Sequence, residues 1–109
     1  MATIDDFLKL DIRVGTVISA NVHPTAKKPS YQLEIDFGSL GIKRSSAQIT
    51  KLYQPEDLLQ KQVIAVVNFP PRRIGGFVSE VLVLGAMGSD GDIILLTTER
   101  PAVSGDAIA

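Results

Sequence analysis

The stretch "YQLEIDF", residues 31–37, alternates apolar and polar side chains without a break. Successive side chains of a β-strand point to opposite faces, so this pattern predicts a strand with its odd-numbered residues in a core and its even-numbered residues in water. It is the clearest periodic signal in the chain, and it places the protein among those built mainly from strands.

Two further strands are predicted on either side of it. "RVGTVISANV" (13–22) is rich in β-branched residues and contains Gly15, which could mark a bulge or bend. "HPTAKKPS" (23–30) then breaks the pattern, and "LGIKRSSAQ" (40–48) predicts a shorter third strand with basic and hydroxyl side chains on its exposed positions.

Two short helices are also expected. Thr3 and Asp6 form a capping signal before apolar residues at helical spacing, which predicts an amphipathic helix at the start of the chain. In "QITKLYQPEDLLQK" (48–61), Pro55 suits the first turn of a second helix, and helical spacing links Ile49, Leu52 and Tyr53.

The later apolar runs predict strands that are covered on both faces. "QVIAVVNF" (62–69) and "SEVLVLGA" (79–86) lack the alternation of a half-exposed strand, and Asp90-Gly91 predicts a tight turn before "DIILL" (92–96). A small barrel leaves its outer wall exposed, so something else must cover these runs. We expect a homodimer to do so, with partial help from the first helix.

This order of elements predicts an all-β domain with short helices: a five-stranded Greek-key OB-fold barrel over residues 1–109, with a C-terminal extension. A β-sandwich or an α+β domain stays open as an alternative. The length suits one domain.

Composition restricts the function classes. The chain has 109 residues, no cysteine and a net charge of −1, so disulfides, thiolate sites and general coating of nucleic acid are not expected. Nine basic and four acidic residues fall within 13–73, whereas both ends are acidic, which could give a local anion-attracting face. No apolar stretch approaches the length of a membrane span, so we expect a soluble cytoplasmic protein.

No catalytic or metal-binding constellation is apparent. His23 is the only histidine and sits beside a proline in a predicted turn, which leaves no metal-ligand cluster and no nucleophile with its base. "GSDGD" (88–92) lacks the rest of a calcium loop, and the glycine-rich stretches match no nucleotide fingerprint. We therefore predict no enzyme, no cofactor and no metal.

The candidate binding residues lie on the third strand and on the connection "NFPPRR" (68–73) with the strand after it. They are Lys43, Arg44, Ser45, Ser46, Gln48, Asn68, Phe69, Arg72, Arg73 and Phe77. Arginine offers a planar fork of donors to phosphate, and serine and amide side chains bind phosphates or base edges, but the same groups suit a polypeptide. Aromatic platforms are sparse, which favours folded RNA over stacked single strands. The arginines could also simply solubilise a proline-stiffened loop.

Four blocks together resemble a known family. "LDIRVGTV" (10–17), "HPTAKKPSYQLEIDFG" (23–38), "KRSSAQIT" (43–50) and "AVVNFPPRRIGGFVSEVLVLGA" (65–86) resemble, in this order, the tRNA-binding domain appended to some methionyl- and phenylalanyl-tRNA synthetases. The free-standing form with these blocks is most similar to the CsaA-type secretion chaperones of that superfamily.

The resemblance implies a non-catalytic OB-fold homodimer, and it adds Ser79 to the candidate binding residues. CsaA-type proteins are implicated in binding unfolded preproteins and the SecA translocase, and the wider superfamily binds tRNA. Two departures from the tRNA-binding pattern favour a polypeptide: Ser46-Ala47-Gln48 replaces a Ser-Gly-Leu-type stretch, and Phe69-Pro70 replaces a lysine after the asparagine. Our leading prediction is thus a chaperone with tRNA binding as the alternative, in which Phe69, Pro70, Pro71 and Phe77 give apolar contact.

Overall fold

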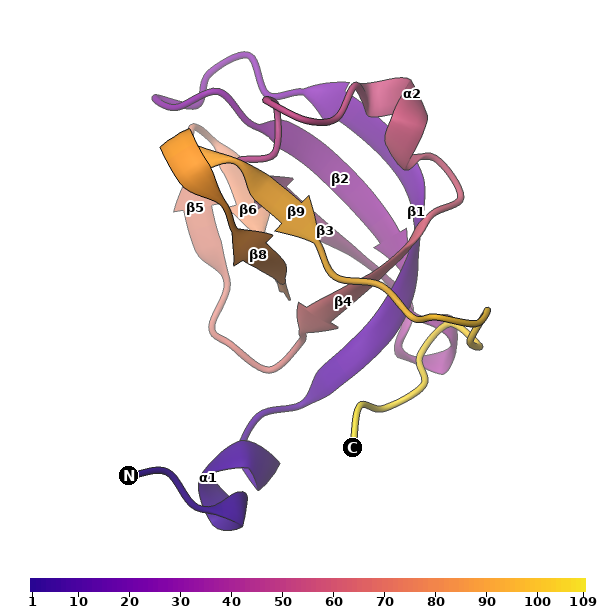
Figure 1. Cartoon of the computed structure of the whole chain (residues 1–109). Coiled ribbons are helices and arrows are strands. Elements are labelled where there is room, and N and C mark those ends of the chain that lie inside the picture. Colours follow the sequence, from indigo (N-terminus) through magenta and orange to yellow (C-terminus); the bar gives the residue numbers. More distant parts are fainter.

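The structure, a computed structural model, describes residues 1–109 and is built around one curled antiparallel sheet. The strands lie in the order β3-β2-β1-β4-β7 and form a nearly closed barrel (Figure 1). A long-range connection therefore places β4 beside β1, which is the Greek-key order of an OB-fold. The predicted fold class is confirmed. The strands are β1 (Ile12–Val22), β2 (Tyr31–Asp36), β3 (Ile42–Ala47), β4 (Gln62–Val66) and β7 (Leu82–Val83).

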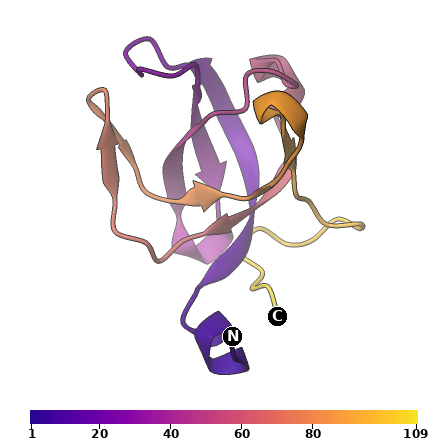
Figure 2. The same cartoon turned by 60° about the vertical axis from the view of Figure 1, so that its left-hand side comes forward.

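Two separate hairpins and four short helical segments complete the chain. Figures 1 and 2 show the β5–β6 hairpin at one side of the barrel and the β8–β9 hairpin across its front. Both α-helices are far too short to cross a bilayer. The bounds are α1 (Ile4–Leu8), η1 (Gly38–Leu40), α2 (Pro55–Leu58), β5 (Arg72–Ile74), β6 (Phe77–Ser79), β8 (Gly85–Met87), η2 (Ser89–Gly91) and β9 (Ile93–Leu95).

The alternation of residues 31–37 builds the core as predicted. Leu33, Ile35 and Phe37 are at most 1% exposed, whereas the polar residues between them reach solvent. Gly15 of β1 faces this row: a Cβ there would lie 2.5 Å from Ile35 and 2.7 Å from the Phe37 ring. Gly15 thus provides room for Phe37, and the bulge of β1 falls further along, between Val17 and Ser19.

The first late apolar run forms β4 only as far as Val66, and residues 63–66 are all buried within the single chain. The strand is thus covered on both faces, as predicted, but the expectation that a second copy is needed to cover it is wrong for these residues. The prediction of one continuous, doubly covered strand over 79–86 is wrong. The run is divided among β6, β7 and β8, and Leu82 is 49% exposed. The division arises because Val81 turns inward to close the barrel against β3, where Ser45 Oγ donates to the Val81 carbonyl at 3.1 Å.

Two other local predictions need correction. Residues 49–53 are not helical: Ile49 is buried in the core, and the Tyr31 hydroxyl donates to the Tyr53 carbonyl at 2.7 Å, so core contacts explain their spacing. The motif "NFPPRR" does not lie entirely in a connection between strands, because Arg72 and Arg73 are the first two residues of β5. The turn at Asp90-Gly91 is confirmed, with φ of 58° and 78° at the two residues.

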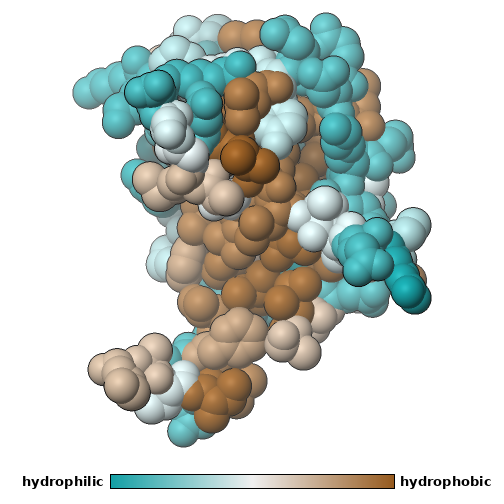
Figure 3. Space-filling model, viewed as in Figure 1, coloured by the Kyte–Doolittle hydropathy of each residue, from teal (hydrophilic) through white to brown (hydrophobic).

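α1 lies apart from the barrel wall. It contains no buried residue, and Ile4 and Leu8 are 69% and 68% exposed. The prediction that this helix helps cover the wall is therefore wrong for the single chain (Figure 1). Figure 3 shows a band of apolar side chains down the middle of the same view, over the position of β4, β8 and β9.

Residues 101–109 form the expected C-terminal extension, which contains no regular strand or helix and is fixed to the start of β1. The Val14 N–H donates to the Asp106 carbonyl and the Ile108 N–H to the Ile12 carbonyl, both at 2.9 Å. Arg13 pairs with Asp11 at 2.6 Å and also donates to the Gly105 carbonyl at 3.1 Å. The extension thus pairs with one edge of β1 instead of covering the apolar band.

Candidate ligand-binding site

The β5–β6 hairpin lies over β3 and creates most of the recesses on this side of the barrel. The Ser46 N–H donates to Ser79 Oγ at 3.0 Å, and the Glu80 N–H donates to the Arg44 carbonyl at 2.8 Å. β6 is therefore attached to β3, while β5 faces outward. Three recesses surround the hairpin, and each combines residues from distant parts of the sequence.

The largest of these, the basic pocket, has a volume of about 460 Å³. It lies between the β1–β2 loop, β3 and β5. No acidic residue lines it, and none of its four cationic side chains takes part in an ion pair of the protein. Such an uncompensated group of charges attracts an anionic ligand. The pocket is lined by Thr25, Ala26, Lys27, Lys28, Ser30, Ser46, Gln48, Arg72, Arg73, Ile74 and Gly75.

A direct contact joins the two loops at the mouth of the basic pocket. Thr25 Oγ1 donates to the Gly75 carbonyl at 2.5 Å. Gly75 has a φ of +54°, and a Cβ there would lie 2.6 Å from the Thr25 carbonyl oxygen. Both the backbone conformation and the close approach therefore require glycine. Figure 2 shows the hairpin tip beside the β1–β2 loop.

A polar cluster lies beneath the basic pocket. His23 is 5% exposed, and its Nδ1 lies 3.1 Å from Ser46 Oγ and 3.5 Å from Ser30 Oγ. Its ring centroid lies 5.5 Å from that of Phe77, and its Nε2 has no hydrogen-bond partner. The single histidine thus supports two serines that line the pocket.

The second recess, the apolar recess, adjoins the basic pocket along β5. It has a volume of about 190 Å³ and shares Ser46, Arg72 and Ile74 with the basic pocket. The two recesses together offer apolar contact and positive charge to one ligand. The apolar recess is lined by Ser46, Phe69, Pro70, Arg72, Ile74, Ser79, Glu80, Val81 and Leu82.

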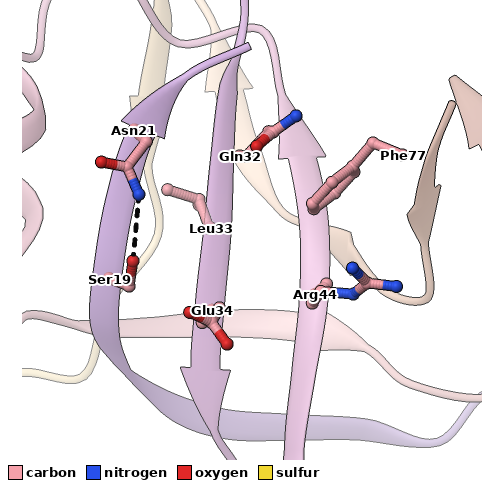
Figure 4. Close-up of a pocket in the computed structure, with 7 residues that line it drawn as sticks. All are labelled: Ser19, Asn21, Gln32, Leu33, Glu34, Arg44 and Phe77. Atoms are coloured by element: carbon pink, nitrogen blue, oxygen red, sulfur yellow. Dashed lines mark hydrogen bonds between the residues drawn. The ribbon is translucent and has the colours of Figure 1, made fainter. Parts of the chain in front are cut away.

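The third recess, the strand-face pocket, lies on β1, β2 and β3 and is shown in Figure 4. Its volume is about 260 Å³, and its single cation is accompanied by Glu34. The Arg44 guanidinium lies 5.0 Å from the centre of the Phe77 ring, the ring that also contacts His23. The one aromatic ring of this pocket already packs against two side chains of the protein, which disfavours it as a platform for stacked bases. The lining residues are Ser19, Asn21, Gln32, Leu33, Glu34, Arg44 and Phe77.

Comparison with known proteins identifies the family. Residues 12–107 match the family described as "Putative tRNA binding domain". The crystal structure of the chaperone CsaA from Bacillus anthracis str. Ames superposes with a TM-score of 0.95 at 54% identity, over 100% of this chain and 99% of that one. The chain belongs to the CsaA-type branch of the tRNA-binding-domain family. The CsaA chaperone of Picrophilus torridus is similar as well, at a TM-score of 0.94 and 51% identity over the whole of both chains.

Curated relatives of this CsaA-type chain include much longer proteins. The methionine–tRNA ligase of Parabacteroides distasonis is 40% identical over 104 residues, which is 95% of this chain but 15% of the ligase. The chain therefore corresponds to about a seventh of the length of such relatives. The match covers nearly all of this chain, which itself fits the tRNA-binding-domain family over residues 12–107.

The structure gathers six of the predicted site residues around the basic pocket and the apolar recess: Ser46, Gln48, Phe69, Arg72, Arg73 and Ser79. Arg44 and Phe77 lie in the strand-face pocket. The other three predicted residues, Lys43, Ser45 and Asn68, line none of the three recesses. Ser45 is buried in the barrel seam, and Asn68 bonds the backbone of Lys9 and Asp11.

Sequence reasoning missed the contribution of the β1–β2 loop. Thr25, Lys27, Lys28 and Ser30 supply one wall of the basic pocket. A signal was present, because adjacent lysines between Pro24 and Pro29 are unusual in a chain with little concentrated charge. Their position beside the arginines of β5, however, depends on the closure of the barrel.

Proposed function

We propose that this CsaA-type protein is a non-enzymatic chaperone that holds unfolded polypeptide across the β5–β6 hairpin. The observation that carries this proposal is the continuity of the basic pocket and the apolar recess through Ser46, Arg72 and Ile74. An unfolded chain presents apolar and charged side chains within a few residues of one another. A site that combines positive charge with apolar surface therefore suits such a ligand better than a site with only one of these properties.

The apolar side of the site is preorganised. Pro70 and Pro71 restrict the connection before β5, and Phe69 is 43% exposed beside them. A stiff loop loses little conformational freedom when it binds, which favours affinity. The likeness to two structures named as CsaA chaperones supports the same function.

Binding to a permanently unfolded protein tests this proposal. Reduced, carboxymethylated α-lactalbumin should bind with a measurable Kd by fluorescence anisotropy, whereas the native, disulfide-bonded form should not. Phe69→Ser should weaken the binding at least about threefold, since it removes apolar area from the recess. Val22→Ser is a control, because Val22 is 65% exposed and lines none of the three recesses. Equal affinity for native and unfolded protein would contradict the chaperone function.

tRNA binding is the second candidate, and the four unpaired cations of the basic pocket favour it. Each phosphate contact releases counterions, so tRNA affinity should fall steeply with added salt. Polypeptide affinity, which rests on apolar contact and only a few charges, should fall much less. A salt series with both ligands on the wild type and on Arg72→Ala/Arg73→Ala separates the two. If the double variant lost tRNA binding and kept full polypeptide binding, the arginines would belong to an RNA site.

The assembly that we propose is a homodimer. Leu82, Met87, Ile94 and Leu96 are each at least 42% exposed. Figure 3 shows a continuous apolar band in the view of Figure 1, in which β8 and β9 lie in front. Such a band is typical of an interface between protein subunits. The resemblance to CsaA-type proteins extends the proposal to a cytoplasmic role in protein export, with unfolded preproteins as ligands and the SecA translocase as a partner.

A further inference from the structure

We propose that an extended polypeptide adds to the open edge of β5 as a third strand and places acidic side chains in the basic pocket. This inference rests on the proposed polypeptide-binding function and specifies the geometry and the chemistry of the ligand.

β5 has an unpaired edge. It belongs to a two-stranded sheet in which its only neighbour is β6, with Arg72 opposite Ser79 and Ile74 opposite Phe77. Outside this ladder, no backbone N–H or carbonyl of residues 72–74 bonds to other backbone. An antiparallel pair leaves alternate N–H and C=O groups on its outer edges, and an extended peptide can bond to such an edge.

The edge of β5 is accessible. Arg72 and Arg73 are exposed, and Ile74 is half-buried. Basic residues and prolines can also guard an edge strand against aggregation. In this hairpin both prolines precede β5, so each residue of the strand keeps its N–H group.

The charge beside this edge selects an acidic segment. β5 itself contributes Arg72 and Arg73 to the basic pocket, and the β1–β2 loop contributes Lys27 and Lys28 opposite them. Arginine forms paired hydrogen bonds with a carboxylate, and Thr25, Ser30 and Gln48 supply further polar groups. The protein brings no acidic residue of its own into the pocket, so the carboxylates would come from the ligand.

The neighbouring apolar recess determines which side chains should stand near the acidic residue of the ligand. Arg72 and Ile74 line both recesses, so a strand beside β5 would pass from one recess to the other. Main-chain hydrogen bonds would supply affinity without sequence preference, and the two recesses would select the side chains. The favoured ligand is an extended segment in which glutamate or aspartate stands within a few residues of a large apolar side chain.

A pair of labelled decapeptides tests whether the basic pocket recognises acidic side chains of the ligand. One contains two glutamates between leucine and valine residues, and its twin carries glutamine at both positions. On the wild type the glutamine twin should bind about tenfold more weakly, because losing the charged hydrogen bonds of the two carboxylates should cost about 1.4 kcal/mol in total. On Lys27→Gln/Lys28→Gln the difference should shrink to about twofold. Lys9→Gln/Lys61→Gln removes the same charge outside the pocket and should keep the full difference.

Amide hydrogen exchange tests whether the peptide adds to the edge of β5 as a strand. Saturating glutamate peptide should slow exchange of an outward-facing amide in residues 72–74 at least about tenfold, and it should leave the amides of β2 unchanged. Replacing single amides of the peptide by esters removes its N–H groups one at a time. An added strand bonds to β5 only through every second residue, so replacements at every second position should weaken binding and those at the positions between should not.

The outcomes separate this inference from the proposed function. If both peptides bind equally, or if exchange in β5 is unaffected, polypeptide is bound elsewhere and the inference is wrong while the chaperone function stands. If neither peptide nor unfolded protein binds and tRNA does, both proposals fail.

Discussion

Asn68 accepts a hydrogen bond from the backbone N–H of Asp11 at 2.9 Å, which ties the segment before β1 to the residues that follow β4. The amide nitrogen of the same side chain donates to the Lys9 carbonyl, also at 2.9 Å. Both polar ends of Asn68 are therefore used within the protein. The opening residue of "NFPPRR" anchors the end of α1, and the part of that motif that lines a recess begins with Phe69.

Replacing Asn68 should cost stability and leave ligand affinity unchanged. Asn68→Ala removes two hydrogen bonds in an exposed setting, so the free energy of unfolding should fall by about 1–2 kcal/mol in urea titrations. Asn21→Ala is a control, because its side chain bonds only the nearby Ser19 hydroxyl. Reduced affinity for unfolded protein at unchanged stability would instead make Asn68 a ligand contact.

The contact between Thr25 and Gly75 should control the shape of the basic pocket. Gly75→Ala and Gly76→Ala both place an alanine at positive φ, at +54° and +81°, which costs about 1–2 kcal/mol. Only Gly75→Ala also brings a Cβ against the Thr25 carbonyl, since nothing lies within 4 Å of the Cβ position at Gly76. We expect Gly75→Ala alone to weaken binding of the acidic peptide, several-fold by anisotropy. The same affinity in both variants would mean that the loop contact does not shape the site.

Gly15 should be indispensable for the core. Gly15→Ala places a methyl group within 3 Å of Ile35 and Phe37, and overpacking of this kind costs about 1–3 kcal/mol. Gly88→Ala is the matched control, because its Cβ would meet only ordinary contacts at 3.5 Å and its φ is −84°. The control should change the free energy of unfolding by less than about 0.5 kcal/mol. Equal stability of the two variants would show that β1 and β2 can separate without penalty.

Period-two alternation in residues 31–37 was sufficient to predict β2 and its core face, because burial on one side of a strand is a local property. The barrel order followed from the number and spacing of strands. The interruption of residues 79–86 was not predictable in this way, since it depends on Val81 turning inward to meet Ser45 across the barrel seam. An apolar run in the sequence does not show which of its residues will be buried by a strand that is distant in the sequence.

The candidate site was predictable in part for the same reason. Arg72, Arg73, Ser46 and Gln48 could be chosen by residue type, and they do line one pocket. Lys27 and Lys28 join them only because the β1–β2 loop meets the tip of the β5–β6 hairpin at Gly75. Residue type did not distinguish Ser45 from Ser46 either: alternation along β3 turns the first inward and leaves the second beside the pocket.

The apolar band should be an interface between two copies of the chain, and a charge introduced on β9 offers a direct test. Ile94 on β9 is 51% exposed, and Ile42 at the start of β3 is 57% exposed. Ile94→Asp places a charge in the proposed interface, where an unpaired charge that loses its water costs several kcal/mol. Sedimentation should show a dimer for the wild type and for Ile42→Asp, and a dimer dissociation constant raised at least about a hundredfold for Ile94→Asp. Near-native circular dichroism of Ile94→Asp would show that the barrel itself survives. A wild-type chain that sediments as a monomer at micromolar concentration would contradict the interface and leave the exposure of Leu82, Met87 and Ile94 to be explained by a different partner.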